Sequence, residues 1–574
     1  MSKFFCSNIS ENISKVVSHN SKFPVNETID ESGMTAVVFD KRAAHHTDYK
    51  RFSVGGVFLV GTPLLREGLT SQSLCRYVYE HTSEEKIAQL KADVVGYWAA
   101  LVIKDGSVYV FNDYYGIYDI CYTTENGIYN IGCDLADVAR CVGKKLELDE
   151  FPFVMENFQV SAFPGYTSFK NICKVRSDNF LKIEGGELKI KKIEKVKIDY
   201  HYMNETNAIN DITSWIKTYA GLIAEKYAPM SINMTGGLDS RLMFAAFNAV
   251  GANISFMHGV HSGGQAEDGV IVKQLSESYG KTLELVDWEQ PKSFNLKDQE
   301  DVFEEIGFNN YLAAGCKKHI DEFFEEAKRY PFTQSGYFCE AIRLREWAEK
   351  KGRTFSLYDY VDDYFIDKNL KSSYQHYNAY RDYLVEGLKR QLVEIGYMGD
   401  VERIPVNLFE RFRWQMSRYH DSRSVVNENK NRFTFSLLAV PYIHEAILSL
   451  PSDVIRGGTF QIKVIERLDP NLMKFDVFSH RRAFYIKNYR KVHKLTKKNL
   501  ADFILGNMPA LKKTAVKIYQ RLKYDSANKR NLMAEQIHEL YEDLPNYINI
   551  DTYQGSLVRL RALAIGLHCI AKEK

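Results

Sequence analysis

One string near the middle of the chain constrains the fold more than any other: Ser231-Ile232-Asn233-Met234-Thr235-Gly236-Gly237-Leu238-Asp239-Ser240. A short β-type run (230–234) ends at two glycines, which allow a tight backbone turn, and a helix is expected at 240–250. A second strand at 254–258 and a helix at 268–279 follow. Strand, helix, strand and helix at this spacing predict a parallel sheet in an α/β domain.

The turn has the chemistry of a phosphate-binding site. Free amide groups and the positive end of a helix converge where the strand ends. Thr235 and Ser240 add hydroxyl donors, and Asp239 is a hard oxygen ligand suited to Mg²⁺. No lysine lies inside the turn, so it is not a Walker-type loop. The alternative is that Gly236 and Gly237 serve close packing alone.

The first third of the chain has the pattern of antiparallel strands. After Lys195 the apolar residues recur at the spacing of a helix. Strands are expected at 54–60, at 94–103 and 107–112 around Asp105-Gly106, at 120–123 and 127–131 around Glu125-Asn126, and at 181–184 and 187–190 around Gly185-Gly186. Helices are expected at 71–80, 150–158, 207–227, 312–330, 374–392 and 551–571.

Composition indicates a large soluble globular protein. Of 574 residues, 45% are hydrophobic and 26% charged, with a net charge of +2. No run approaches the roughly 18 apolar residues that cross a bilayer, and the first fifteen residues lack an apolar signal core, so a cytoplasmic protein without a transmembrane segment is expected. Nine scattered cysteines without a Cys-x-x-Cys pair do not form a metal or redox signature.

Positive charge is concentrated in residues 478–530. This stretch holds fifteen Lys/Arg and two acids, Asp502 and Asp525. Two interpretations stay open: the solvated face of packed helices with a cationic wall toward the active site, or a patch for an anionic partner such as a carrier protein, nucleic acid or membrane surface. No aromatic-rich recognition motif accompanies it, so there is no strong nucleic-acid signal.

The string 231–240 resembles the pyrophosphate loop of the N-type ATP pyrophosphatases, and its residues are most similar to those of the asparagine synthetase family. Residues 256–260, 267–280 and 283–285 look like that family's second strand, acidic residue and helix. The resemblance implies ATP and Mg²⁺ as cofactors. It also implies the following roles: Ser231, Thr235, Gly236, Gly237 and Ser240 hold pyrophosphate, Asp239 binds Mg²⁺, and Met234, Met257 and Gly336 touch adenosine mainly through backbone.

A second loop, Thr333-Gln334-Ser335-Gly336-Tyr337-Phe338-Cys339-Glu340, departs from the family's usual sequence. It is similar to the corresponding loop of the β-lactam and carbapenam synthetases. That similarity implies that Tyr337 helps to deprotonate the attacking amine and that Glu340 is a catalytic Mg²⁺ ligand. Phe338 stands where those enzymes have glycine, which makes the backbone conformation there a question. The alternative for Tyr337 is a partly buried aromatic with a structural partner.

Near the C-terminal third, the segments 436–443, 448–451 and 458–463 look like three further family motifs. Lys463 matches the lysine of the last one. The resemblance gives it a catalytic role, because a cation can neutralise charge on the α-phosphate and on the tetrahedral intermediate. The alternative is an ordinary surface lysine.

The N-terminal third resembles the family's glutaminase of the N-terminal-nucleophile type, in the segments 94–102, 112–117, 132–135 and 167–172. A glutaminase needs a thiol on the residue after Met1, and this chain has Ser2. Cys6 lacks the glycine that follows the nucleophile in the family. The chain is therefore expected not to hydrolyse glutamine.

Together these observations predict two domains: a degenerate glutaminase-like α+β domain of the N-terminal-nucleophile type (1–197), and an α/β synthetase domain of the adenine-nucleotide α-hydrolase-like type with a helical C-terminal part (198–574). The expected activity is ATP-dependent, AMP-forming amide ligation of a small-molecule or peptide carboxylate to an amine, in natural-product or surface-glycan biosynthesis. Three alternatives stay open: glutamine-dependent asparagine synthesis, a non-catalytic scaffold, and transfer of the adenylate to a hydroxyl or thiol. A homodimer stays open as the assembly.

Overall fold

The computed structural model describes most of the chain, with several gaps. The described residues are 2–42, 49–52, 55–66, 73–159, 161–200, 204–260, 266–287, 295–308, 317–334, 336, 338, 346–455, 458–477, 534, 537, 548–550, 553 and 557–572. The basic stretch 478–530, Tyr337 and Glu340 lie outside them. Within them, no helix combines the length and the apolarity needed to cross a bilayer.

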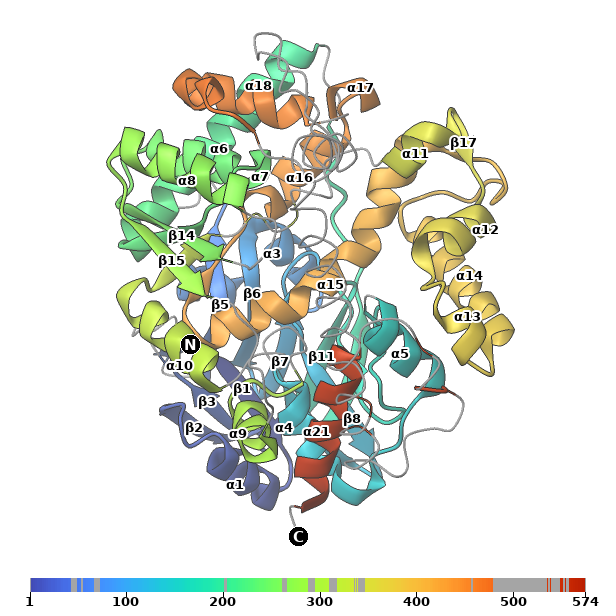
Figure 1. The fold of residues 1–574 in the computed structure, drawn as a ribbon. Coiled ribbons are helices and arrows are strands. Elements are labelled where there is room, and N and C mark those ends of the chain that lie inside the picture. Colours follow the sequence, from blue (N-terminus) through green and yellow to red (C-terminus); the bar gives the residue numbers. More distant parts are fainter. Residues whose placement is uncertain are drawn as a thin grey trace.

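Two six-stranded antiparallel sheets form the N-terminal part (Figure 1). In spatial order the first sheet consists of β10 (Cys173–Lys174), β8 (Cys121–Glu125), β9 (Ile128–Gly132), β1 (Lys3–Ser7), β3 (Met34–Phe39) and β2 (Val25–Glu31). The second consists of β12 (Glu187–Lys192), β11 (Asn179–Glu184), β7 (Ser107–Asn112), β6 (Val94–Lys104), β5 (Gly55–Leu65) and β4 (Tyr49–Phe52).

The two sheets pack face to face between two layers of helices. Alternate strand residues, such as Phe4 of the first sheet and Leu101 of the second, share one core. Phe5 points to the opposite face, where the first sheet meets α1 (Ser10–His19), α4 (Leu135–Val142) and α5 (Glu150–Val154). The second sheet is covered by α2 (Leu74–Glu80) and α3 (Ile87–Asp93). Because both faces are covered, β1 is buried along its whole length.

The predicted hairpins are confirmed, with one shifted turn. Asp105 and Gly106 have positive φ between β6 and β7, and Gly185 and Gly186 do so between β11 and β12. Between β8 and β9 the turn residues are 126 and 127, with φ values of 53° and 76°, so the predicted turn at 125–126 is wrong by one residue. The β1 to β3 segment, α1 and α4 have no counterpart in the sequence analysis.

A parallel five-stranded sheet forms the centre of the C-terminal part, as predicted. Its spatial order is β15 (Leu283–Asp287), β14 (Ile254–Val260), β13 (Met230–Asn233), β16 (Phe332–Gln334) and β19 (Phe433–Thr434). One core joins it to α6 (Glu205–Tyr227), α7 (Leu238–Asn248), α8 (Ala266–Tyr279), α16 (Pro441–Leu448) and α18 (Thr459–Leu468). These helices lie in the upper part of Figure 1.

Four further described helices form a lobe beside the sheets (Figure 1): α11 (Glu346–Lys351), α12 (Leu357–Tyr360), α13 (Leu370–Ser373) and α14 (Tyr377–Glu394). α9 (Leu296–Ile306), α10 (Lys317–Arg329) and α21 (Val558–Lys572) lie near the first sheet, and α15 (Phe409–Asn431) crosses the middle of the molecule. α17 (Ser452–Ile455) lies beside α18 and shares the core of the parallel sheet. Two short strands, β17 (Thr354–Phe355) and β18 (Ile404–Pro405), pair within the lobe. The C-terminal α21 shares a core with α4 of the N-terminal part.

Buried charges join the two parts of the chain. Asp134, at the start of α4, lies against the ammonium groups of Lys3 in β1, at 3.2 Å, and of Lys430 in α15. Burial alone raises the pKa of Asp134, but these two cations outweigh it and hold the pKa well below its usual value. The carboxylate is therefore charged at neutral pH and ties α15 to the antiparallel sheets.

This arrangement predicts an acid-sensitive contribution to stability. A carboxyl group whose pKa is lower in the folded state stabilises the fold above its unfolded pKa of about 3.9, and this stabilisation is lost as the pH falls below that value. At pH 7 we expect Asp134→Asn to lower the free energy of unfolding by about 3 kcal/mol, because the buried ammonium group of Lys430 loses its carboxylate partner and Lys3 keeps only Asp137.

Urea unfolding of wild type and Asp134→Asn at pH 7 and pH 3 measures this effect. The gap between the two proteins should shrink as the pH falls. Asp211→Asn, at an exposed position of α6, is the matched control and should behave as wild type at both pH values. A gap that stays constant with pH would contradict the assignment of this charge.

Candidate nucleotide site

The order in which strands are added to the parallel sheet reverses between β13 and β16. From β13 the chain adds β14 and β15 on one side, and then returns to add β16 and β19 on the other. In open parallel sheets, ligands bind beyond the carboxyl ends of the strands at this reversal. The two loops that leave β13 and β16 are the turn before α7 and the loop that contains Gly336 and Phe338. The topology therefore brings together the two loops singled out from the sequence.

Thr235 and Ser240 close the turn after β13 on itself. The Thr235 amide donates to the Ser240 hydroxyl at 3.0 Å, and that hydroxyl donates to the Thr235 carbonyl at 3.1 Å. The Gly237 amide donates to the Thr235 hydroxyl at 3.2 Å. Both hydroxyls therefore shape the turn from within, in addition to any role as phosphate donors.

Gly236 is held from both sides by buried charged side chains. Its amide donates to the carboxylate of Asp268 in α8, and its carbonyl accepts from the guanidinium of Arg241 at 3.2 Å. Arg241 is fully buried, and it also donates to main-chain carbonyls of the segment 472–476 at 2.5 to 3.0 Å. Asp268 corresponds to the acidic residue noted in the sequence after the second strand, whereas nothing in the sequence analysis pointed to Arg241.

These contacts show which amides of the turn are already bonded within the protein. The amides of residues 235, 236 and 237 already donate to oxygens of the protein. The amides of residues 238 to 240 form the first turn of α7, where no intrahelical acceptor exists. The positive end of the helix lies at the same point. The first turn of α7 is therefore the part of this site where a polyphosphate is expected.

Gly336 lets the second loop approach this turn. A Cβ atom on Gly336 would lie 3.2 Å from the Cβ of Asp239 and 3.7 Å from the amide nitrogen of Ser240. Gly336 therefore lies against the start of α7. Its contact with adenosine, which the resemblance implied, stays a prediction.

Asp239 is oriented by a residue that the sequence analysis missed. Gln461 of α18 is fully buried, and its Nε2 donates to Oδ1 of Asp239 at 3.1 Å. No donor among the described residues reaches its Oε1. Gly458, with a φ of 84°, begins α18 close to Leu238. A glutamine carries no charge signal, so only the packing of α18 on α7 identifies it.

Lys463 lies on a different side of α18. Its ammonium group forms an ion pair with Glu205 at the start of α6. Two residues along a helix are separated by about 200°, so Lys463 and Gln461 face different neighbours. The structure thus brings Gln461, and not Lys463, to Asp239. A catalytic role for Lys463 stays a prediction that requires the ion pair with Glu205 to open.

Three further predicted residues belong to the sheet itself. The hydroxyl of Ser231 is buried and donates to the Thr333 hydroxyl at 3.1 Å across β13 and β16, so it points into the sheet and not at the turn. The Met234 amide donates to the Met257 carbonyl at 2.8 Å, and the ring of His258 bonds to the Met234 carbonyl at 3.0 Å. These main-chain groups extend the strand pairing toward the site.

One carboxylate at this site suits a metal ion. Mg²⁺ is often bound by one or two carboxylates together with substrate phosphates, and Asp239 at the start of α7 fits that donor set. Within the described ranges, no cluster of three His, Cys, Asp or Glu side chains could hold a metal by itself. The predicted second ligand, Glu340, and the predicted catalytic Tyr337 lie outside the described residues.

Phe338 has a backbone conformation that favours glycine. Its φ is 67°, and the other described non-glycine residues with positive φ lie in hairpin turns. Its ring is buried, with its centroid 4.9 Å from that of Trp414 in α15 and 5.8 Å from that of Tyr97 in β6. The aromatic contacts offset the backbone strain, and they anchor the second loop to the core between the antiparallel sheets.

The two residues considered as glutaminase nucleophiles, Ser2 and Cys6, are buried at the first antiparallel sheet. Ser2 is fully buried, its amide donates to the Phe39 carbonyl at 2.8 Å, and its carbonyl accepts from the Tyr118 hydroxyl at 2.7 Å. Cys6 is also fully buried, and burial raises the pKa of its thiol well above the usual value. Neither side chain is placed to attack a substrate.

Comparisons with known proteins add little to this geometry. No protein-family model matches the chain, and no curated protein matches it. Similar solved structures include the glutamine phosphoribosylpyrophosphate amidotransferase from B. subtilis complexed with ADP and GMP, at 7% identity and a TM-score of 0.23, covering 55% of this chain and 95% of that chain.

Two further structures are similar at the same low level. They are the U34-tRNA thiolase from Methanococcus maripaludis with its [4Fe-4S] cluster (13% identity, TM-score 0.20, 58% of this chain and 85% of that chain) and an allosteric regulatory enzyme of purine biosynthesis (10%, 0.23, 52% and 77%). At these TM-scores the likeness supports neither a fold nor a function.

The conformation of Phe338 predicts an unusual order of stabilities. Phe338→Ala loses the aromatic contacts, about 3 kcal/mol or more, and keeps the positive φ. Phe338→Gly loses the same contacts but removes a strain of about 1–2 kcal/mol. We therefore expect the glycine variant to be more stable than the alanine variant by about 1 kcal/mol in urea unfolding.

At a helical position alanine is more stable than glycine. Ala208→Gly in α6 is the control for this order, and it should lower the free energy of unfolding. A Phe338→Ala variant more stable than Phe338→Gly would contradict a positive φ at residue 338.

Proposed function

We propose that the chain is an ATP-dependent ligase that activates a carboxylate as an acyl-adenylate and joins it to an amine. One observation carries the proposal: the turn 235–240 and Gly336 meet at the strand-order reversal of the parallel sheet, with the first-turn amides of α7 and Asp239 at the same point. In this proposal residues 1–197 are a glutaminase-like domain without glutaminase activity, and residues 198–574 are the synthetase domain.

The residues would act on the first step as follows. A carboxylate oxygen of the substrate attacks the α-phosphorus of ATP, and pyrophosphate leaves. The amides of residues 238 to 240 stabilise the charge that develops on the departing phosphates. Asp239, held by Gln461, would take Mg²⁺, which neutralises the phosphate oxygens when bound. Arg241 and Asp268 keep the turn in this shape.

In the second step the amine attacks the acyl carbon, AMP leaves with the electron pair of the broken bond, and the amine loses a proton. By resemblance, Tyr337 would assist this proton loss and Glu340 would complete the metal site. The amine would come from a second substrate or from the same molecule, because Ser2 and Cys6 are buried within the sheet. Natural-product or surface-glycan biosynthesis is the proposed context.

The activity is tested by exchange of labelled pyrophosphate into ATP with a panel of carboxylates, including amino acids, short peptides and sugar acids. Mass spectrometry of the condensed product then distinguishes an amide from an ester or thioester. Exchange with no carboxylate of the panel would favour the non-catalytic alternative, whereas an ester or thioester product would show a hydroxyl or thiol nucleophile.

Variants at the start of α7 and in α18 predict separate effects. Asp239→Asn should abolish exchange, because a neutral amide is a poor Mg²⁺ ligand. Gln461→Leu should lower the rate by about tenfold, through loss of the hydrogen bond that orients Asp239. Lys463→Met should have the smaller effect, because the structure pairs this lysine with Glu205.

Asp211→Asn is again the matched control, since it removes the same charge from an exposed position. A loss with Lys463→Met as large as that with Gln461→Leu would support the catalytic role that the resemblance gives to the lysine.

Glutamine should not serve as the nitrogen source. We expect no glutamate release from glutamine, in the presence or absence of ATP, because the amide of Ser2 is bonded within the sheet and its side chain is buried. Cys6→Ala should leave pyrophosphate exchange unchanged. Stoichiometric glutamate release that stops in Cys6→Ala would instead support glutamine-dependent asparagine synthesis.

A further inference from the structure

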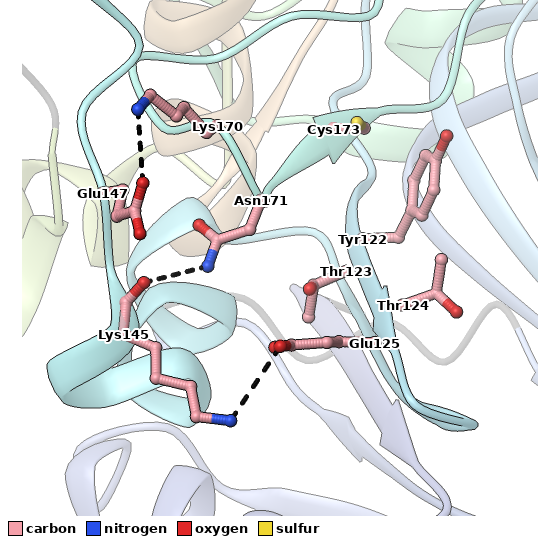
Figure 2. Close-up of a pocket in the computed structure, with 9 residues that line it drawn as sticks. All are labelled: Tyr122, Thr123, Thr124, Glu125, Lys145, Glu147, Lys170, Asn171 and Cys173. Atoms are coloured by element: carbon pink, nitrogen blue, oxygen red, sulfur yellow. Dashed lines mark hydrogen bonds and ion pairs between the residues drawn. The ribbon is translucent and has the colours of Figure 1, made fainter.

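A groove of about 450 Å³ opens at the edge of the first antiparallel sheet, away from the nucleotide site. Figure 2 shows its lining: one side is the end of β8, and the other is formed by the segments 145–147 and 170–173. The volume is in the range of known ligand sites. No role in the proposed ligase reaction involves these residues.

The groove exists because β10 is shorter than β8. β10 pairs only with residues 121 and 122 of β8, through Lys174 and Cys173. Before Cys173 the chain turns aside, and the Asn171 side-chain amide donates to the Lys145 carbonyl at 3.1 Å. The last three residues of β8 are therefore paired with β9 on one side and uncovered by strand on the other.

Thr124 presents its main chain to this open side. The Ile120 carbonyl accepts from the Val175 amide on the β10 side of the sheet. In an antiparallel ladder every second residue faces the same side, so residues 122 and 124 face it as well. β10 covers residue 122, and no hydrogen bond from the described chain reaches the main chain of Thr124 from this side. The main-chain N–H and C=O of Thr124 are thus spaced as a partner strand requires.

Four charged side chains line the groove, of which Lys170 and Glu147 pair at 3.2 Å and Glu125 is more loosely held. Glu125 lies 3.9 Å from the ammonium group of Lys145 across the groove, and both side chains are more than half exposed. Figure 2 shows Glu125 and Thr123 pointing toward Asn171 and the 145–147 wall. The Oδ1 atom of Asn171 is buried and meets no donor within the described ranges. A ligand could therefore use a carboxylate and an amide acceptor without breaking a tight ion pair.

Another edge strand of the molecule shows the opposite pattern. β12, at the edge of the second sheet, carries Lys189, Lys191 and Lys192 along its six residues. Lysines on an edge strand discourage pairing with another chain. The open end of β8 instead reads Thr-Thr-Glu, with β-branched residues that favour strand pairing. This edge lacks the protection that β12 has.

We propose that this groove binds an extended peptide segment of a partner protein, which adds to the edge of β8 in line with β10. One peptide residue would exchange both main-chain hydrogen bonds with Thr124. In the antiparallel register of β10, the preceding peptide residue lies opposite Glu125. The charge of Glu125 therefore selects a lysine or arginine at that position. The proposal does not depend on the ligase reaction, since the groove belongs to the first sheet.

The test uses two capped, fluorescein-labelled peptides of alternating threonine and valine, with either lysine or glutamate at one central position. Fluorescence anisotropy should show tighter binding of the lysine peptide to the full chain. Glu125→Lys should reverse this preference. Thr124→Pro should weaken both peptides by about tenfold or more, because it removes the groove-facing amide while leaving the β9 side intact.

Glu187→Lys is the matched control, since it makes the same charge change on an exposed residue of β12, and it should leave both affinities unchanged. Hydrogen exchange of the Thr124 amide should slow when the lysine peptide binds. If Thr124→Pro does not fold, as judged by circular dichroism, the reversal by Glu125→Lys and the exchange of Thr124 in wild type still decide the question.

Three results would overturn the proposal. They are the absence of saturable binding by either peptide, an unchanged preference in Glu125→Lys, and a wild-type dimer in sedimentation that Thr124→Pro converts to monomer. The last result would show that the edge of a second copy occupies the groove.

Discussion

The buried guanidinium of Arg241 is the contact on which the geometry of the turn after β13 depends. It joins the Gly236 carbonyl to three carbonyls of the segment 472–476, which follows α18. Through this one side chain the turn after β13 and the chain after α18 keep a fixed relation. Gln461 can then reach Asp239, because α18 packs against α7. A buried cation with several carbonyl acceptors is well suited to this task, since each unsatisfied donor would be costly in the interior.

The second loop depends on the N-terminal part of the chain in a comparable way. Phe338 lies between Trp414 and Tyr97, within the core that the two antiparallel sheets share. The sheets thus support a loop of the nucleotide site even though their own Ser2 and Cys6 are sealed from solvent. The ion pairs of Asp134 with Lys3 and Lys430 strengthen the same junction. The antiparallel sheets therefore have a structural role in holding the loop that contains Phe338.

Local patterns in the sequence were sufficient for the hairpins and for the start of the parallel sheet. Asp105-Gly106 and Gly185-Gly186 mark turns because positive φ is needed there, and glycine accepts it without strain. Strands β1 and β3 escaped prediction because nearly all of their residues are buried, so the alternation of polar and apolar residues that identifies a half-exposed strand is absent from them. Strand β2 is polar and partly exposed along most of its length, so it carries no apolar signal. Among the site residues, Gln461 was missed because a neutral amide has no distinctive pattern. Ser231 was assigned to the phosphate site because the sequence places it near the turn, although its side chain points toward Thr333 inside the sheet.

By itself, the sequence determined that a strand, a glycine turn and a helix follow one another at residues 230–250, and that antiparallel hairpins precede them. Those features depend on neighbouring residues, whose backbone preferences act over a few positions. Only the tertiary structure decided which amides of the turn are already bonded, which side of α18 meets Asp239, and how Phe338 tolerates a positive φ. The last two depend on side chains that lie hundreds of residues apart in the chain, Asp239 and Gln461 in one case and Tyr97 and Phe338 in the other, and these meet only when the sheets and helices have packed. The first depends on contacts within the turn and on Asp268 of the next helix.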